Sequence, residues 1–154
     1  MPTPSTAPAV PLLVLDTQVV LDLLVFGDPS AITLLAALRA GTVVWLACPL
    51  HREEFRRVAS PQRCAQWHTD PSKVLAAFDA LCHPVPDPAP SGPTVPRCRD
   101  LDDQGFIDLA CTHHAQALLS RDKAVLALRQ RLWRDWRVVV QRPQDWQPRA
   151  QLDA

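Results

Sequence analysis

The sequence lacks three features that would narrow its function at once: an excess of one charge, a long apolar run and closely spaced cysteines. Sixteen basic residues balance sixteen acidic ones, so the net charge gives no argument for a nucleic-acid or membrane partner. No apolar run reaches the ~18 residues of a membrane span, and the chain does not start like a signal peptide. We therefore expect a cytoplasmic protein with no part in the membrane.

The cysteines are too widely spaced for paired roles. Neighbouring cysteines lie 13 to 18 residues apart, so no two of them match a zinc knuckle or a redox motif. We predict that all are free thiols, several of them buried, as is usual inside cells. They are Cys48, Cys64, Cys82, Cys98 and Cys111.

A length of 154 residues fits one domain. Ten of the sixteen prolines fall within residues 1–11 and 84–96. We predict that residues 1–11 form a disordered leader and that residues 84–96 form a surface loop, because proline cannot supply ladder hydrogen bonds. The domain itself is predicted to cover residues 12–142, followed by a polar tail over residues 143–154.

Apolar runs alternate with helical patterns along this domain. Strands are predicted at Leu12–Asp16, Val43–Cys48, Ala117–Ser120 and Trp136–Val140, each nearly continuous in apolar residues. Such strands are typical of a sheet that is covered on both faces, so the sequence predicts a three-layer α/β/α fold with a central, mostly parallel sheet. The predicted helices are residues 19–26, 31–40 with Ser30 as N-cap, 50–59, 73–81, 101–114 and 123–133.

Acidic residues gather where the predicted strands end. In an open parallel sheet ligands bind beyond the carboxyl ends of the strands. Two carboxylates ~4 Å apart repel by about 4 kcal/mol at an effective dielectric of ~20, so several of them together need a cation or a proton. These acids are Asp16, Glu53 or Glu54, the group Asp100, Asp102 and Asp103, and Asp122.

An all-oxygen site of this kind favours Mg²⁺ or Mn²⁺. Such ions activate water and stabilise an in-line phosphoryl displacement, which suits a nuclease. An aspartate-nucleophile phosphatase also starts from a strand that ends in aspartate. That chemistry needs a second aspartate two residues later, where Gln18 stands, so it ranks last.

Four segments, in this order and at these separations, resemble the PIN-domain ribonucleases: LVLDTQVVLD, HREEFRRV, CRDLDDQGFIDLA and ALLSRDKAVL. The resemblance runs from about Leu12 to Leu126 and is greatest to a bacterial branch described as toxins of toxin–antitoxin pairs. It implies a parallel sheet flanked by helices and an acidic site that binds magnesium or manganese and hydrolyses RNA. The partners to be expected are an RNA substrate, a cognate antitoxin protein and a second copy in a homodimer.

Matched position by position, the resemblance assigns metal binding and catalysis to Asp16, Glu54, Asp103 and Asp122. Helix geometry also favours Asp103 over its neighbours, because the positions three, four and seven residues later are all apolar and pack on the sheet. Glu53 remains an alternative to Glu54 as the ligand.

Three further residues are expected to support these acids. Gln18 stands where the family usually has asparagine, and Ser120 keeps the hydroxyl of the usual threonine. Asp100 is more typical of a helix cap than of a ligand. Gln104 and Gly105 also depart from the family pattern.

Two alternatives stay open. The chain can be a PIN-like module that binds RNA or protein with little cleavage, Gln18 and Gln104 then being signs of decay. The stretch 121–142 carries seven basic and two acidic residues together with Trp133 and Trp136. It is either an RNA-facing patch with stacking aromatics or a solvated helix face beside core tryptophans.

Overall fold

A computed structural model describes residues 10–89 and 92–148 of the chain. Most of the predicted leader and the end of the predicted tail therefore lie outside the described residues. Within them, helices and strands alternate from Leu12 onwards, as the sequence predicts.

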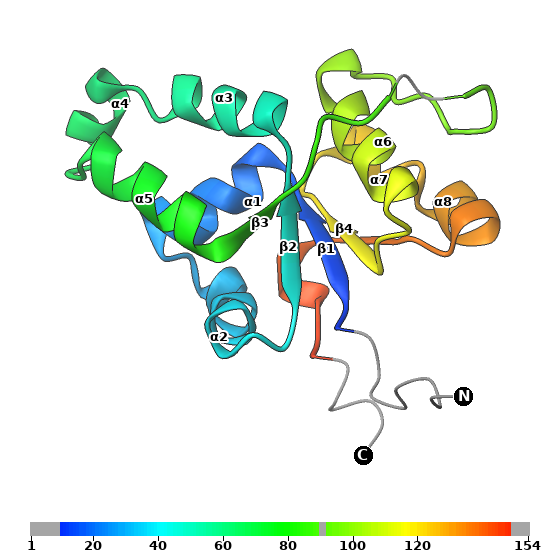
Figure 1. Ribbon diagram of the computed structural model, residues 1–154, viewed down its shortest axis with the longest axis horizontal. Helices are drawn as coiled ribbons and strands as arrows, with labels where there is room; N and C mark the ends of the chain where they lie inside the picture. Colours follow the sequence, from blue (N-terminus) through cyan, green and yellow to red (C-terminus); the bar gives the residue numbers. More distant parts are fainter. Residues whose placement is uncertain (1–9, 90–91, 149–154) are drawn as a thin grey trace, which may run out of the picture.

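All five strands of the sheet are parallel, which confirms the predicted α/β class and goes beyond a mostly parallel sheet. The strand order is β3-β2-β1-β4-β5, so β1 lies at the centre between β2 and β4 (Figure 1). The first two connections therefore lead to one side of β1, and the later ones lead to the other. The strands are β1 (Leu12–Leu15), β2 (Val44–Ala47), β3 (Cys82–Pro84), β4 (Ala117–Leu119) and β5 (Val139–Gln141).

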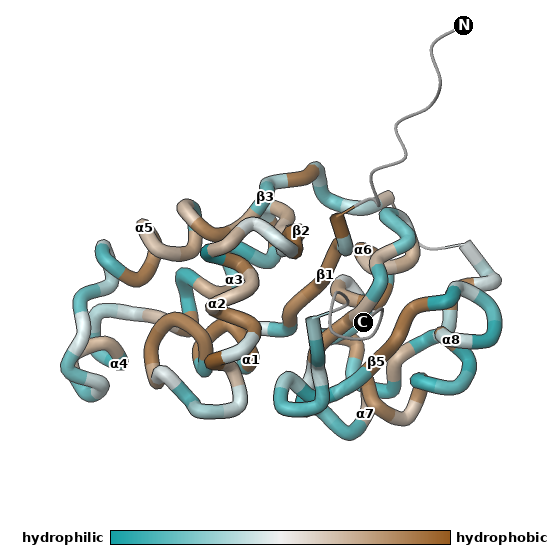
Figure 2. The backbone as a smooth tube through the Cα atoms, turned by 90° about the horizontal axis from the view of Figure 1, so that it is seen from below, coloured by the Kyte–Doolittle hydropathy of each residue, from teal (hydrophilic) through white to brown (hydrophobic). Residues whose placement is uncertain are grey.

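Helices cover both faces of this sheet, so the fold has the predicted three layers (Figure 1). Side chains of β1 alternate between two cores: Leu13 and Leu15 face one, and Val14 faces the other. The central strand β1 is hydrophobic along its length, whereas hydrophilic and hydrophobic stretches alternate on the surrounding helices (Figure 2). The first core is covered by α1 (Thr17–Leu21), the π-helix η1 (Asp22–Phe26), α2 (Ile32–Ala40), α4 (Pro61–Gln66) and α5 (Pro71–Leu81), and the second by α6 (Gln104–Thr112), α7 (Lys123–Leu126) and α8 (Arg129–Trp136).

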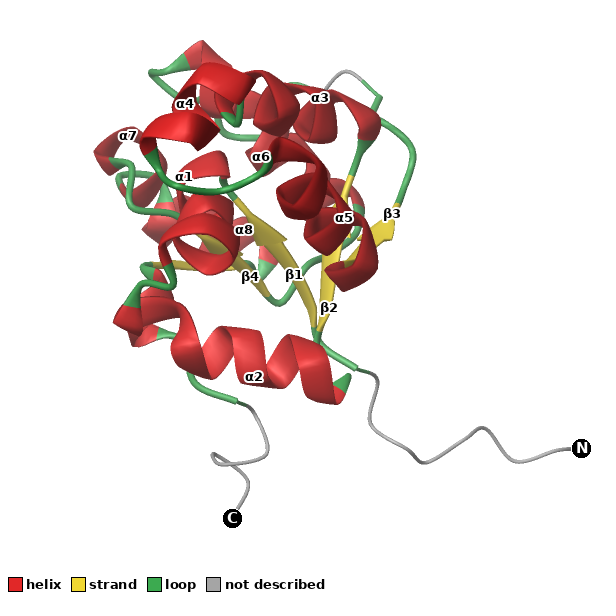
Figure 3. Cartoon of the chain, turned by 90° about the vertical axis from the view of Figure 1, so that its left-hand side faces the viewer, coloured by secondary structure: helices red, strands yellow, loops and turns green. Residues whose placement is uncertain are grey.

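One helix, α3 (Pro49–Val58), starts at the carboxyl end of β2 and extends from there over α1 and α5 (Figure 1). Its buried Phe55 packs in the first core, against Phe78 of α5. Helix α2 lies near the opposite ends of the strands (Figures 1 and 3). The carboxyl edge of the sheet is thus the edge where α3 and α6 come together.

The N-cap predicted at Ser30 is wrong. Asp28 caps the short 3-10 helix η2 (Pro29–Ala31), and its Oδ1 accepts from the Ser30 amide at 2.9 Å. Pro29 stands at the first helical position, where its missing N–H costs nothing. The end predicted for α2 is confirmed, because Gly41 closes the helix in the left-handed region with φ 74°.

Two elements between β2 and α6 were not predicted. Helix α4 begins where Ser60 caps it and Pro61 takes the first helical position, a local signal that the sequence does contain. Strand β3 ends at Pro84, inside the segment predicted as a loop. Proline is tolerated there because β3 is an edge strand and pairs only with β2.

The region after β4 also departs from the prediction. The single helix expected over residues 123–133 is two, α7 and α8, which meet at Ala127–Leu128. The last strand begins at Val139 instead of Trp136, which still belongs to α8. The predicted tail starts with the 3-10 helix η4 (Pro143–Asp145), and Trp146 packs into the first core with 4% of its surface exposed.

All five cysteines are described and carry free thiols, as predicted, and only Cys82 is partly exposed. Within the described ranges, no single helix is both long and apolar enough to cross a membrane. Residues 17–26 and 29–40 would meet that test only as a pair, which is bent by 104°.

Candidate active site

Asp16 lies at the centre of the carboxyl edge, where β1 passes into α1. It is the N-cap of α1, and its Oδ1 accepts from the Val19 amide at 2.9 Å. Its Oδ2 accepts a hydrogen bond from the Ser120 hydroxyl. Burial raises the pKa of Asp16, since only 5% of the residue is exposed; the hydrogen bond from Ser120 opposes this, and the charge of Asp122 adds to it.

Ser120 links the two central strands at this edge. Its hydroxyl is fully buried, donates to Asp16 and accepts from the Asp122 amide at 3.0 Å. The Asp16 amide in turn donates to the Leu119 carbonyl at 3.1 Å. The supporting position predicted for Ser120 is therefore a contact to two of the predicted acids.

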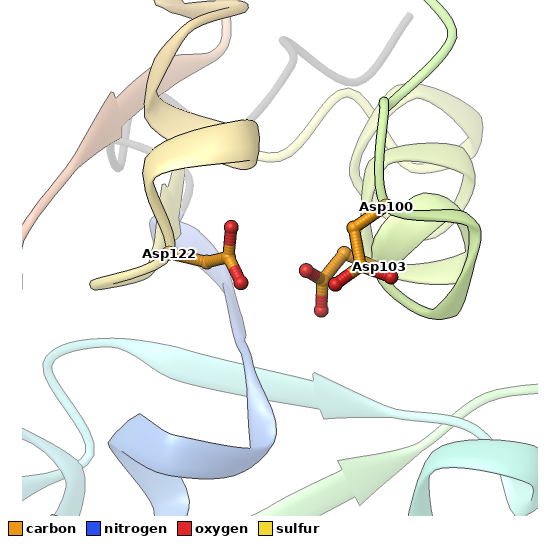
Figure 4. Close-up of side chains that lie close together, drawn as sticks. All are labelled: Asp100, Asp103 and Asp122. Atoms are coloured by element: carbon orange, nitrogen blue, oxygen red, sulfur yellow. The ribbon is translucent and has the colours of Figure 1, made fainter.

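Asp122 is the N-cap of α7, just as Asp16 is the N-cap of α1. Its Oδ1 accepts from the Ala124 amide at 2.7 Å and caps the helix. Its carboxylate faces Asp100 and Asp103 across the gap beyond β1 (Figure 4).

Asp100 and Asp103 come from the turn that leads into α6. Asp100 caps the 3-10 helix η3 (Leu101–Asp103), and its Oδ1 accepts from the Asp102 amide at 3.0 Å. The Asp103 amide donates to the Asp100 carbonyl at 3.1 Å, so the turn brings these two residues together. Asp100 is thus a cap, as predicted, and also a member of the acidic group.

Oxygen atoms of Asp100, Asp103 and Asp122 lie within 4.8 Å of one another. This close set of carboxylates, which we call the acid cluster, brings two of the four predicted ligands together with Asp100. In the part of the chain that is described, Asp16 and Glu54 do not belong to this closest set. Asp16 lies beside it through Ser120.

Asp103 is the most perturbed acid of the cluster. Burial raises its pKa to about 7, together with the charge of Asp122, a hydrogen bond with that side chain, and the charges of Asp100 and Asp16. One of its carboxylate oxygens is buried without a hydrogen-bond partner. A buried, unpartnered oxygen beside two other carboxylates is the donor set that a hard divalent cation binds, so these residues fit Mg²⁺ or Mn²⁺.

The structure separates Glu54 from Glu53. The Glu53 side chain is exposed and forms an ion pair with Arg56, one turn further along α3. Glu54 is half-buried; burial raises its pKa, and the charges of Asp102 and Asp16 add to this. Glu54 is therefore the residue of α3 that faces the acids, while Glu53 is engaged at the surface.

Neither glutamine that departs from the family pattern contacts the cluster. Gln18 is exposed and donates to Asp22 Oδ1 at 3.2 Å, so the structure does not bring it to the predicted acids. Gln104 is buried; its amide donates to the Pro96 carbonyl at 3.1 Å, and its oxygen accepts from the Cys98 amide at 2.6 Å. Gln104 ties the proline-rich segment to the start of α6.

Sequence reasoning missed one partly buried ion pair next to the site. Arg121, between Ser120 and Asp122, lies with Nε 3.0 Å from Asp22 Oδ2, and its guanidinium also donates to the Ser30 hydroxyl. Only 6% of the Asp22 side chain is exposed. The signal in the sequence was a lone aspartate within the apolar run VVLDLLVF. This pair anchors the segment that carries two site residues.

A second unpredicted contact joins α3 to α6. The His51 ring stacks on Phe106 with a centroid distance of 4.0 Å, and burial lowers the pKa of His51 to about 4. A Cβ at Gly105 would lie 2.8 Å from His51 Nε2. Gly105 therefore lets α3, which carries Glu54, approach closely to α6, which follows Asp103.

Two acids of the cluster, Asp100 and Asp122, line a shallow hollow of about 570 Å³ that is open to solvent. A polymer can reach these two carboxylates from the surface. The hollow is lined by Arg99, Asp100, Leu101, Asp102, Asp122, Lys123 and Ala124.

Comparison with protein families gives one match, to a family model described as PIN domain, over residues 12–124. The matched segment contains all four predicted ligands and every strand except β5. No curated protein and no solved structure matches the chain.

Proposed function

Since the chain belongs to the PIN-domain family, we propose that it is a metal-dependent endoribonuclease. Asp16, Glu54, Asp103 and Asp122 are its proposed metal-binding and catalytic residues, with Asp100 as a further ligand. One observation carries this proposal: three carboxylates converge within 4.8 Å beyond the carboxyl ends of the central strands, and one of them has a buried oxygen without a partner. Such a group is stable in its ionised form only with a cation.

The acid cluster of Asp100, Asp103 and Asp122 would hold Mg²⁺ or Mn²⁺. When bound, such an ion supplies a water of lowered pKa and stabilises the charge that develops on a phosphodiester. Asp16 stays fixed beside the cluster because the Ser120 hydroxyl and the Val19 amide hold both of its oxygens. Glu54 lies on α3, and its carboxylate, whose pKa is raised by burial, can take up a proton during the reaction.

The test is cleavage of a circular RNA, which only an endonuclease can open. The wild type should cleave it with manganese or magnesium and should lose cleavage in chelator. Asp16→Asn and Asp103→Asn should abolish cleavage while the fold survives. The matched control is Asp79→Asn, because it removes the same charge from an exposed position on α5, outside both the cluster and its hollow.

Two results would overturn the proposal. The first is undiminished cleavage by Asp16→Asn in chelator, which would show that neither the metal nor the aspartate is needed. The second is an inert wild type that holds no divalent ion in titration calorimetry. That result would favour the binding-module alternative, whose sequence signs, Gln18 and Gln104, are both engaged away from the cluster.

We further infer the toxin role of a toxin–antitoxin pair, which rests on the sequence resemblance. An antitoxin segment would occlude the acidic hollow and bring an arginine or lysine to its carboxylates. Co-expression with the product of the neighbouring open reading frame should then give a stable, inactive complex. Full ribonuclease activity in the presence of every neighbour tested would favour a housekeeping role.

A further inference from the structure

A second hollow adjoins the acidic one and has the opposite charge. It measures about 540 Å³ and shares Lys123 with the hollow that Asp100 and Asp122 line. Three basic side chains line it, Lys123, Arg129 and Arg142, against one carboxylate, Asp145. We call this second hollow the basic groove.

The cations of the basic groove are not neutralised by the protein. Lys123, Arg129 and Arg142 are exposed, and across the described residues none of them forms an ion pair. Other basic side chains of the same region do, since Arg121 pairs with Asp22 and Arg134 with Asp135. Three basic side chains without an ion pair in the described part of the chain therefore line the groove together, while Arg131 and Arg137 lie outside it.

Three elements build the groove next to the site. Helix α7 begins at Asp122, within the acid cluster, and its last residue, Leu126, lines the groove. Helix α8 contributes Arg129 at its first turn, where no side chain caps the helix and the amide dipoles favour an anion. Arg142 directly follows β5, and this strand lies beside α7 and α8 (Figure 2).

An RNA strand bound at the acid cluster meets a difficulty that this arrangement resolves. The phosphates on either side of the cleaved bond are repelled by the carboxylates, which a divalent ion only partly neutralises. Cationic side chains one short helix away attract the phosphates on one side of the cleaved bond and so offset this repulsion. An uncharged or compact substrate would gain nothing from it.

We propose that the basic groove binds the backbone phosphates of the RNA strand on one side of the cleaved phosphodiester, with Lys123 at the junction of the two hollows. The inference rests on the proposed ribonuclease function. It adds the path that the bound RNA strand follows from the acid cluster over the protein surface. The contacts are to phosphates, so they carry affinity and not base sequence.

The tryptophans nearby are not part of this surface. Trp133 is 49% exposed, and the guanidinium of Arg137 lies over its ring at 5.0 Å. Neither residue lines the groove, and Trp136 is partly buried against the second core. The tryptophans that the sequence suggested for base stacking thus lie apart from the basic side chains that line the groove.

The test measures binding of a fluorescent single-stranded RNA by anisotropy, in chelator, so that no cleavage occurs. Lys123→Ala, Arg129→Ala and Arg142→Ala should each weaken binding several-fold, and the triple variant should flatten the slope of log affinity against log salt by about 2. The control is Arg131→Ala, which removes a charge from the same exposed helix outside the groove. It should change affinity less than twofold.

Cleavage kinetics give the second readout. With manganese, the groove variants should raise KM and leave kcat close to the wild-type value, because they touch only the flank of the substrate. If the wild type cleaves no RNA, the proposed function fails, and the anisotropy result still decides on the groove. Triple-variant binding as tight as that of Arg131→Ala, with an unchanged salt slope and a native circular-dichroism spectrum, would overturn the inference.

Discussion

Replacing Asp103 with asparagine should stabilise the metal-free protein, and the gain should grow with pH. Asp103 is forced close to Asp100 and Asp122, and one of its oxygens is buried without a partner. Its ionised form is therefore disfavoured in the folded state and solvated in the unfolded chain. Asparagine has nearly the same shape and carries no charge at any pH.

The sign follows from the direction of the shift. The folded-state pKa of Asp103 is about 7, above the ordinary 3.8. Below pH 4 the carboxyl is protonated in both states and costs nothing. As the pH rises towards 7, the unfolded chain ionises freely while the folded chain resists, so stability is lost over this window. Above pH 7 the loss is complete and constant.

The size of the loss follows from the same values. A pKa of about 7 in place of 3.8 corresponds to about 4 kcal/mol at most. Because the side chain is only partly buried, solvent screening reduces this free-energy cost. For comparison, two carboxylates ~4 Å apart in a partly solvated site repel by about 4 kcal/mol. We expect Asp103→Asn to raise the free energy of unfolding by about 1–3 kcal/mol at pH 8 in chelator.

Urea denaturation at pH 5, 6, 7 and 8 in chelator measures this difference. Asp102→Asn serves as control, since it removes an exposed charge from the same turn and should show no comparable pH-dependent gain. Magnesium should then reverse the order by stabilising the wild type and not the Asp103 variant. An asparagine variant no more stable than the wild type at pH 8, or a gain independent of pH, would refute the reasoning.

Three further predictions concern residues around the site. Gly105→Ala should lower the free energy of unfolding by about 1–3 kcal/mol, because the new methyl group meets His51, and combining it with His51→Ala should cost less than the sum of the two changes. Glu54→Gln should abolish RNA cleavage while Glu53→Gln retains it; equal losses would contradict the separation of the two side chains. Denatured, unreduced protein should titrate five thiols with Ellman's reagent, and a count of three or fewer would reveal a disulfide.

The fold could be predicted because its signals are local. The apolar strands β1 and β4 are each followed within three residues by an aspartate that caps a helix, Asp16 and Asp122. The same residues point to the carboxyl edge of the sheet, since strand ends in a parallel sheet meet there. Strand β3 was missed because Pro84 argues against a strand unless its edge position is known.

Much of the site geometry depends on contacts between distant segments, which no local pattern encodes. Glu53 and Glu54 are adjacent acids, and only the packing of α3 decides which one faces the cluster. Asp100 has the sequence signal of a cap, and its place in the cluster follows from the 3-10 turn that the cap begins. Gln18 stands at the expected position, but it bonds to Asp22, a residue with no expected role.

The pairing of β1 with β4 determines how late in synthesis the site can be completed. Asp16 and Ser120 are hydrogen-bonded partners separated by 104 positions in the chain. A sheet without hairpins forms its pairs only through long crossovers, and such distant contacts are slow to close. An emerging polypeptide therefore carries Asp16 and Glu54 long before it carries Asp103 and Asp122. Chains released early during synthesis hold half of the acids, so under the proposed ribonuclease function only completed domains should cut RNA.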